Sequence, residues 1–171
     1  MGGLGPDLFR LGEPVGVDGD AGIISLAGVE GTRVVTSFLF RPDGRFLLLR
    51  RSRHVGSFRG RWAGVSGFLE DPTPFDQAVR EIREETGIPR SALGGARQGR
   101  PVYARTAGRL FVVTPFRFTV RRPAVALDWE HAEARWIAPR ELARFRTVPR
   151  LAEALRSALR GERPKPGTPH R

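Results

Sequence analysis

The sequence contains no cysteine, and this absence excludes disulfide bridges, thiolate zinc sites and a cysteine nucleophile. It also contains no apolar run long enough to cross a membrane. The N-terminus, MGGLGPDLFRLGEPVG, has no basic start followed by an apolar segment, so a secretory signal is not expected. Together these absences predict a soluble, cytoplasmic protein, and 171 residues suffice for one domain with a buried core.

Lysine is almost missing, since Lys165 is the only lysine among 29 basic residues, and the formal net charge is +11. A positive surface attracts anions, including substrates that carry phosphate. However, arginine, alanine, glycine and proline are all abundant, which is the composition that a GC-rich genome gives to many proteins. The charge is therefore compatible with a phosphate-bearing substrate but does not identify one.

One acidic stretch organises the chain: residues 80–88 read REIREETGI. On a helix, Glu81, Glu84 and Glu85 stand at i, i+3 and i+4 and share one face. Carboxylates grouped in this way repel one another, and Mg²⁺ or Mn²⁺, which prefer carboxylate oxygens, would offset that repulsion. The alternative is a solvated acidic turn on an ordinary surface helix.

Signals at both ends predict a helix around these glutamates. Thr73 is suited to the N-cap, Pro74 to the first helical position and Gly87 to a left-handed C-terminal cap. An apolar stripe at helical spacing would anchor the helix through one face and leave the glutamates on another. This stripe consists of Phe75, Ala78, Val79 and Ile82.

Residues 67–88 resemble the signature box of the Nudix hydrolases. In that box Gly, five residues, Glu and seven residues precede Arg-Glu-apolar-x-Glu-Glu-x-Gly-apolar, and residues 80–88 match the second half at every position. The resemblance covers roughly residues 33–160. It implies metal-dependent hydrolysis of a phosphoanhydride bond in a nucleotide derivative.

The first half of the box departs from the pattern. Pro72 stands where the box glutamate is expected, and Ser66 stands where the glycine is expected. A loop shortened by one residue would let Gly67 take the place of the glycine. It would leave Glu70 and Asp71 as nearby carboxylates, so the loop's contribution to the site is open.

The resemblance also assigns roles to the helix residues. Glu81, Glu84 and Glu85 would hold Mg²⁺ or Mn²⁺, and Glu81 and Glu84 would also belong to the catalytic set. Arg80 would be structural: it would pair with a glutamate of its own helix and fix the loop that starts at Gly67.

A second acidic cluster lies at residues 128–133, which read DWEHAE. In Nudix hydrolases a glutamate from the loop before a tryptophan-containing strand often completes the metal site or acts as the base. Glu130, Glu133 and Trp136 are similar to that element, and Glu130 is the better catalytic candidate by its spacing. The alternative is an ordinary surface loop.

Four arginines could bind substrate phosphates through bidentate contacts. They are Arg50 and Arg51, at the end of a strand, and Arg59 and Arg61, in the loop that follows. The alternative is that the strand simply ends on its solvent side. His54 and His131 lack the spaced partners of a metal site or a base, so both are expected to be polar surface residues.

Hydrophobic patterning predicts a mixed fold. Strands are expected at 23–26, 34–40, 45–51, 62–69, 101–105, 110–120 and 134–137, and helical segments at 74–86, 139–142 and 149–160. Residues 34–40 and 45–51 should form a hairpin across the turn at 41–44, and residues 89–97 a loop. This order predicts an α+β fold, an α/β/α sandwich with a Nudix-like mixed sheet flanked by helices.

Three segments divide the chain. Residues 1–30 are a glycine-rich segment in which residues 23–26 could form an edge strand or a dimer contact, so a homodimer is left open. Residues 31–160 form the Nudix-like hydrolase domain. Residues 161–171 are rich in proline and charge and are expected to be a disordered tail.

Three functions remain open. The first is hydrolysis of a nucleoside diphosphate linked to another moiety, namely a nucleotide sugar, ADP-ribose, a dinucleoside polyphosphate or a nucleoside triphosphate. The second is a Nudix-fold nucleotide sensor or regulator with weak catalysis, which the missing box glutamate favours. The third is a basic nucleic-acid-binding protein, which is disfavoured because aromatic and basic residues do not interleave beyond single residues such as Phe58. The phrases GRWAGVSGFLE, DWEHAEARWI and TVPRL are similar to Nudix modules related to initiation-factor-2B-like proteins, which assigns no substrate.

Overall fold

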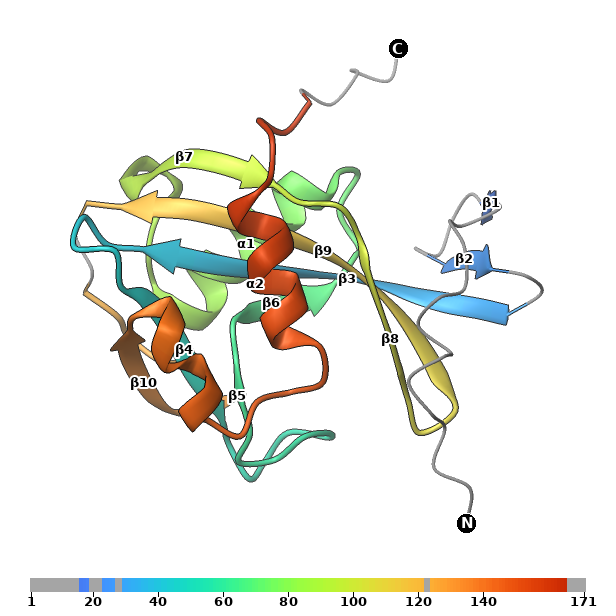
Figure 1. The fold of residues 1–171 in the computed structure, drawn as a ribbon, viewed down its shortest axis with the longest axis horizontal. Coiled ribbons are helices and arrows are strands. Elements are labelled where there is room, and N and C mark those ends of the chain that lie inside the picture. The colour runs from blue at the N-terminus through green and yellow to red at the C-terminus, as the bar shows by residue number, and fades with distance from the viewer. Residues whose placement is uncertain (1–15, 19–22, 27–28, 122–123, 166–171) are drawn as a thin grey trace.

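A computed structural model describes residues 16–18, 23–26, 29–121 and 124–165. A mixed β-sheet lies at the centre, and helices pack against its two faces (Figure 1). The expected α+β sandwich is therefore confirmed. The expectations for residues 1–15 and 166–171 fall outside the described residues.

The long strand β3 (Val29–Phe40) is the centre of the sheet. It runs parallel to β9 (Arg109–Val120) on one edge and antiparallel to β6 (Val65–Phe68) on the other. Its first residues also pair with β2 (Ile23–Leu26), which in turn pairs with β1 (Gly16–Asp18). In the described part of the chain, β2 is therefore flanked on both sides and is not an edge strand.

A second group of strands surrounds β4 (Phe46–Arg51), which pairs with β5 (Trp62–Ala63) and with β10 (His131–Ile137). The prediction of a hairpin between β3 and β4 is correct only at the turn. Beyond the turn the two strands pair at a single position, Phe40 with Phe46. The reason is that β6 and β9 already occupy both edges of β3.

Two further strands follow the first helix, β7 (Leu93–Gln98) and β8 (Val102–Thr106), and both pair with β9. Residues 89–97 were expected to be a loop, but they contain the short helix η2 (Arg90–Ala92) and most of β7. Two consecutive glycines, which have a low strand propensity, made this segment look like a loop in the sequence. In the structure it forms a strand because it pairs with β9.

The helix α1 (Pro74–Thr86) covers one face of the sheet, and α2 (Leu151–Leu159) covers the other, where it crosses in front of β3 and β9 in Figure 1. A short helix, η3 (Pro139–Arg144), precedes α2. Alternate residues of β3 and β4 enter the two cores, as the two-residue period of a strand requires. The α1 core contains Val35, Leu39, Leu47 and Leu49, and the α2 core contains Phe38, Phe40, Phe46 and Leu48.

Residues 161–165, at the start of the expected tail, lie against β7. The backbones of Glu162 and Gln98 exchange two hydrogen bonds of 2.7 and 3.0 Å. Gly161 allows this close approach, because a Cβ there would lie 2.7 Å from the backbone of Gln98. This part of the tail is therefore paired, in contrast to the expectation from its composition.

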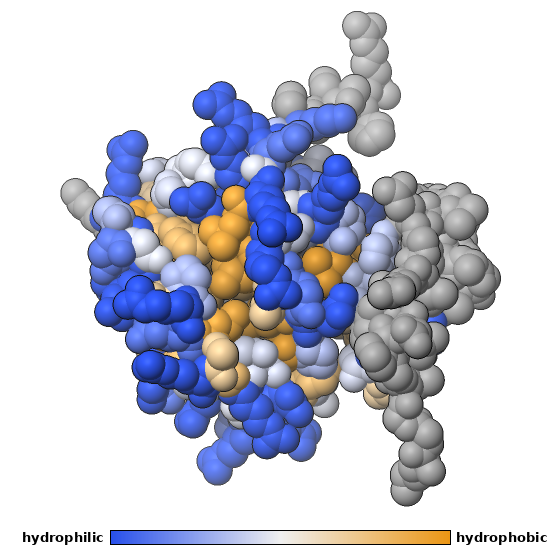
Figure 2. Space-filling model, viewed as in Figure 1, coloured by the Kyte–Doolittle hydropathy of each residue, from blue (hydrophilic) through white to orange (hydrophobic). Residues whose placement is uncertain are grey.

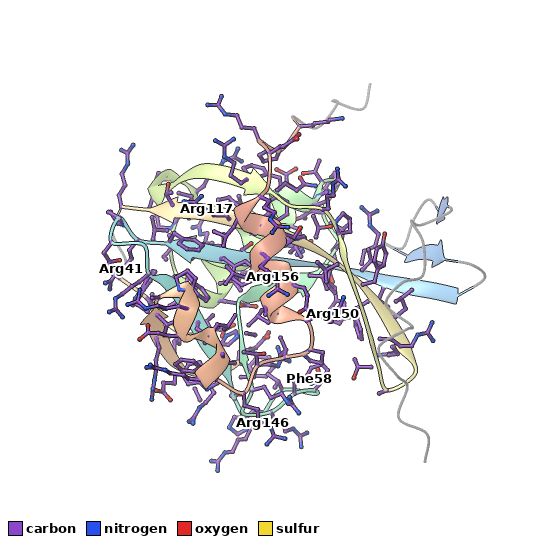
Figure 3. The ribbon with its side chains drawn as sticks, viewed as in Figure 1. Arg41, Phe58, Arg117, Arg146, Arg150 and Arg156 are labelled. Atoms are coloured by element: carbon purple, nitrogen blue, oxygen red, sulfur yellow. The ribbon has the colours of Figure 1, made fainter. Side chains whose placement is uncertain are left out.

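The face that carries α2 is apolar at its centre and ringed by hydrophilic residues (Figure 2). Its arginines come from separate elements (Figure 3). Arg41 stacks on Trp136 with 5.2 Å to the ring centroid, and Arg117 stacks on Phe40 at 5.0 Å. No helix in the described ranges is long and apolar enough to span a bilayer.

Candidate functional site

The sequence signals at the ends of α1 are confirmed. Thr73 is the N-cap, and its Oγ1 accepts a hydrogen bond of 3.1 Å from the backbone N–H of Asp76. Gly87 adopts a left-handed conformation (φ 72°) and donates its N–H to the carbonyl of Arg83. Ala78 and Ile82 are fully buried, so this face of the helix fixes the glutamates relative to the sheet.

Gly67, at the end of β6, lies directly against the carboxyl group of Glu81. A Cβ on Gly67 would overlap with that carboxyl group, and even Cγ of Glu81 would be only 2.7 Å away. The glycine is therefore needed for space rather than for a special backbone angle. The position of Gly67 agrees with the shortened loop expected from the sequence.

Gln77 is the most connected side chain of the site, and the sequence analysis missed it. It is completely buried on α1. Its Oε1 accepts hydrogen bonds from the backbone N–H groups of Glu70 (2.8 Å) and Asp71 (2.9 Å), and its Nε2 donates to Oε1 of Glu81 at 2.6 Å. The available signal was its place four residues before Glu81, on the same helical face.

Arg80 does not pair with a glutamate of its own helix, as was expected. Its Nη2 donates to Oε2 of Glu70 at 2.9 Å, and its Nε lies 3.2 Å from Oδ2 of Asp71. The loop between β6 and α1 brings these two carboxylates back over the helix. The expectation that Arg80 fixes the loop agrees with these contacts, and the partners lie in the loop itself.

Glu85 is buried between β6 and the start of β10. Its Oε2 lies 3.4 Å from the backbone N–H of Ser66 and 3.7 Å from Nε2 of His131. Burial, followed by the negative charges of Glu81, Glu130 and other acids, raises the pKa of Glu85 to about 9. Without a cation this side chain therefore carries a proton at neutral pH.

Glu81 is half-buried, and its environment also disfavours negative charge. Burial is the largest effect and raises its pKa to about 7, together with the charges of Glu84 and Glu130 and against the hydrogen bond from Gln77. Glu84 itself is exposed. The charges of Glu84 and Glu130 act on Glu81, and those of Glu81 and Glu130 act on Glu85, so Glu130 lies within electrostatic reach of both helix glutamates.

Glu130 comes from the loop before β10 and not from the helix. Its backbone N–H donates to Oδ1 of Asp128 at 3.1 Å, and its carbonyl accepts from the N–H of Ser52 at 2.7 Å. The bond from Ser52 attaches the loop to the end of β4, and the bond to Asp128 lies within the loop. Glu133, in contrast, lies on β10 and pairs with Arg50 (3.6 Å) on the adjacent strand.

The expectation that His131 is a surface residue is wrong. Its side chain is only 2% exposed, and its Nδ1 lies 3.0 Å from Oδ1 of Asp128. The ring therefore stands between Asp128 and Glu85. Sequence periodicity could not predict the burial of His131, because its contact with Glu85 joins the start of β10 to α1, which is distant in the sequence. His54 is exposed, as expected.

The four arginine candidates are not gathered at the carboxylates. Arg59 donates to the carbonyl of Val55 at 2.8 Å and Arg61 to the carbonyl of Thr147 at 3.1 Å. Arg50 pairs with Glu133, as described above. Arg51 is opposite His131 in the β4–β10 pairing, although its Nε donates to the carbonyl of Ser57. Of the four, Arg51 lies in register with the site.

The donor set suits a hard divalent cation, because carboxylate oxygens dominate, and burial together with the charges of neighbouring carboxylates raises the pKa values of Glu81 and Glu85. As the side chains stand, no three acidic or histidine groups among residues 29–121 and 124–165 converge as a ready ligand set. The hydrogen bond from Gln77 holds one oxygen of Glu81. Glu85 faces Ser66, so side-chain adjustment would accompany binding.

Comparisons with known proteins agree with this fold. A family model described as NUDIX domain matches residues 31–158. A search of curated proteins finds no match. Among solved structures, a MutT protein from Methanosarcina mazei Go1 is 24% identical with a TM-score of 0.64, covering 80% of this chain and 97% of the other.

Two further structures have the same fold. An Ap4A hydrolase of C. elegans, in a binary complex, is 20% identical with a TM-score of 0.61, covering 74% of this chain and 93% of the other. The NUDIX domain of NrtR from Shewanella oneidensis, complexed with ADP ribose, is 18% identical with a TM-score of 0.58, covering 75% and 88%. At these identities the likeness shows the fold.

Proposed function

The chain belongs to the Nudix family of pyrophosphohydrolases, and we propose that it hydrolyses a phosphoanhydride bond in a nucleoside diphosphate linked to another moiety, with Mg²⁺ or Mn²⁺ as cofactor. The observation that carries this proposal is the electrostatic coupling of Glu81 and Glu85, on α1, to Glu130, in the loop before β10, whose charge contributes to raising the pKa of both helix glutamates. Two of these carboxyl groups have pKa values raised to about 7 and about 9. A bound cation would stabilise the ionised form of both carboxyl groups.

Glu81, Glu84 and Glu85 would hold the divalent cation. When bound, a divalent cation withdraws negative charge from phosphate oxygens as the anhydride bond breaks. Glu130 would accept the proton of the attacking water. It lies in the loop before β10 and is not one of the three α1 glutamates that would hold the cation. Ser52 and Asp128 hold the backbone of that loop and so orient Glu130.

Arg80 would act on the reaction only through the loop, which it ties to α1 by its ion pairs with Glu70 and Asp71. Arg51 would bind a substrate phosphate after giving up its bond to Ser57. Arg50, Arg59 and Arg61 would bind a phosphate only after leaving their partners, which are Glu133, the carbonyl of Val55 and the carbonyl of Thr147.

The substrate class is proposed from the same site and from the similar structures. One of those is an Ap4A hydrolase and another holds ADP ribose. Both ligands join a nucleoside to a second group through phosphoanhydride bonds. We therefore expect turnover within a panel of ADP-ribose, dinucleoside polyphosphates, nucleotide sugars and nucleoside triphosphates.

The test is hydrolysis of each panel member with Mg²⁺, with Mn²⁺ and with chelator. Wild type should cleave at least one compound with metal and none with chelator. Glu85→Gln should abolish turnover, whereas Glu133→Gln on the surface of β10 should not. Unchanged turnover in both Glu84→Gln and Glu85→Gln would refute the mechanism.

A nucleotide sensor is the second candidate, because Pro72 stands in place of a box glutamate. Tight nucleotide binding without turnover on any panel member would favour it. Calorimetry on the same compounds separates the two functions.

Nucleic-acid binding has one observation in its favour, a hollow of about 620 Å³ beside the start of α1 and β7. Its basic lining residues are Arg90, Arg97, Arg163 and Lys165. Fluorescence anisotropy with single-stranded RNA tests this function. Affinity should fall in the double variant Arg97→Ala/Arg163→Ala and not in the equally charged control Arg53→Ala/Arg140→Ala, with a matching loss of salt dependence.

The cytoplasmic location and the homodimer are proposals from the sequence. Light scattering of the purified protein at several concentrations tests the dimer. Fractionation of cells that express the full chain tests the location.

A further inference from the structure

Gln77 occupies an enclosed position between the loop and the catalytic face of α1. None of its surface is exposed. A buried amide requires partners for its oxygen and its nitrogen, and here both are satisfied. Three donors surround Oε1, namely the N–H groups of Glu70 and Asp71 and Nη2 of Arg80 at 3.1 Å. One carboxylate oxygen, from Glu81, accepts from Nε2.

These partners fix the orientation of the amide. A flipped amide would place Nε2 against three donors and Oε1 against a carboxylate, so each of these contacts would become repulsive. The flipped orientation of the Gln77 amide is therefore strongly disfavoured. It holds Oε1 of Glu81 at 2.6 Å and leaves Oε2 of that residue without a hydrogen bond to any residue in the described ranges.

The loop between β6 and α1 depends on the same side chain. Glu70 and Asp71 lie in irregular backbone just before Pro72, which has no N–H to donate. Gln77 accepts the two N–H groups that the loop presents to the helix. Arg80 then joins the two acidic side chains to the same point. Loop and carboxylate are thus coupled through one amide.

We propose that Gln77 is a positioning residue for the hydrolysis: its amide aims Glu81 by holding Oε1, and the same group fixes the loop that precedes α1. This inference rests on the proposed function for its effect on rate. It explains how the site keeps a defined loop although Pro72 replaces a carboxylate there. Gln77 itself touches no reacting atom.

Two variants separate its two contacts. Gln77→Leu retains similar bulk and removes all hydrogen bonds. Gln77→Glu keeps an acceptor for the loop N–H groups and for Arg80 but opposes Glu81 with a second carboxylate. Ile137→Val, buried in the α2 core on the opposite face of the sheet, is the control for a general loss of stability.

Three measurements are made on each protein. Hydrogen exchange at the N–H groups of Glu70 and Asp71 is followed without metal or substrate. Mn²⁺ affinity is measured by electron paramagnetic resonance of the free ion. Then kcat and KM are determined on whichever panel compound the wild type cleaves.

Gln77→Leu should expose both N–H groups to faster exchange and weaken Mn²⁺ affinity and kcat by about 10–100-fold, with little change in KM. Gln77→Glu should keep the N–H groups protected and still lose kcat. Ile137→Val should lower Tm alone. A twofold or smaller effect of Gln77→Leu on both Mn²⁺ affinity and kcat would overturn the proposal.

Two other outcomes are decisive. If Gln77→Leu does not fold, normal Mn²⁺ affinity and kcat in Gln77→Glu would overturn the proposal, and their loss with protected N–H groups would support it. If the wild type cleaves no compound, the proposed function fails. The exchange and Mn²⁺ measurements then still decide whether Gln77 orders the loop and Glu81.

Discussion

Gly67 and Glu81 are packed so closely that no side chain can stand between them, because a Cβ on Gly67 would overlap with the Glu81 carboxyl group. The contact joins the last residues of β6 to the middle of α1. It follows that the glycine at this point of the box is required by the carboxylate across from it. The backbone of Gly67 is otherwise that of an ordinary strand.

Gly67→Ala should therefore displace Glu81. We expect kcat to fall by about tenfold or more and the unfolding free energy to fall by about 1–3 kcal/mol, as for other overpacked sites. Gly56→Ala is the matched control, since nothing lies within 4 Å of a Cβ there. Steady-state kinetics and thermal unfolding check both variants, and normal kinetics in Gly67→Ala would contradict the close contact.

Glu85→Gln should separate catalysis from stability. The pKa of Glu85 is raised to about 9, so the side chain is already neutral at pH 7 in the metal-free protein, and a neutral amide replaces it with little cost. We expect equal or higher Tm without metal and a loss of kcat of about a hundredfold or more. Glu133→Gln removes a surface carboxylate and should change neither quantity. A large drop in metal-free Tm for Glu85→Gln would show that the residue is charged there.

Local signals predicted α1 well, because a cap, a first-turn proline and a terminal glycine act within a few residues of one another. Thr73 and Gly87 take the conformations that their residue types favour. The sequence also predicted the apolar stripe, since Ala78 and Ile82 stand at helical spacing and both are buried. The glutamate face follows from the same period.

The rest of the site depends on contacts between distant segments. His131 resembles any loop histidine until β10 places it beside Glu85, and the partners of Arg80 become visible only when the loop folds back. Gln77 shows the same limit, because its two N–H partners lie in a loop without regular structure. Likewise β7 is hidden by Gly94 and Gly95 until β9 supplies hydrogen bonds.

Stability without metal should decrease as pH rises from 5 to 8. The folded protein keeps protons on Glu81 up to about pH 7 and on Glu85 up to about pH 9, whereas the unfolded chain releases them near the ordinary value of 4.5. The unfolded state therefore binds fewer protons in this window, and the unfolding free energy falls with rising pH. Glu81 and Glu85 make no contribution to this pH dependence below about pH 4.5, and the decline from Glu81 ends near pH 7.

Mg²⁺ should reverse this decline, because a bound cation favours the ionised carboxylates. The expected result is a larger Mg²⁺-induced increase in Tm at pH 8 than at pH 5, measured by calorimetry. Glu85→Gln should show a flatter pH profile. A metal-free Tm that rises between pH 5 and 8 would contradict the raised pKa values.

His131 should support Glu85 and Glu130 together. Its Nδ1 lies 3.0 Å from Oδ1 of Asp128, the same atom that accepts the N–H of Glu130, and its Nε2 faces Glu85. His131→Phe fills the space but removes both nitrogens, so we expect kcat to fall by about 10–100-fold, as for other residues that orient metal ligands.

The His131 effect should depend on Asp128, which a double-mutant cycle can measure. If the ring and the carboxylate act as one unit, Asp128→Asn combined with His131→Phe should cost little more than either change alone. His54→Phe, at an exposed loop position, should leave kcat unchanged. Additive losses in the cycle would mean that Asp128 acts only on the Glu130 backbone, and normal kcat in His131→Phe would mean that Glu85 keeps its place without the ring.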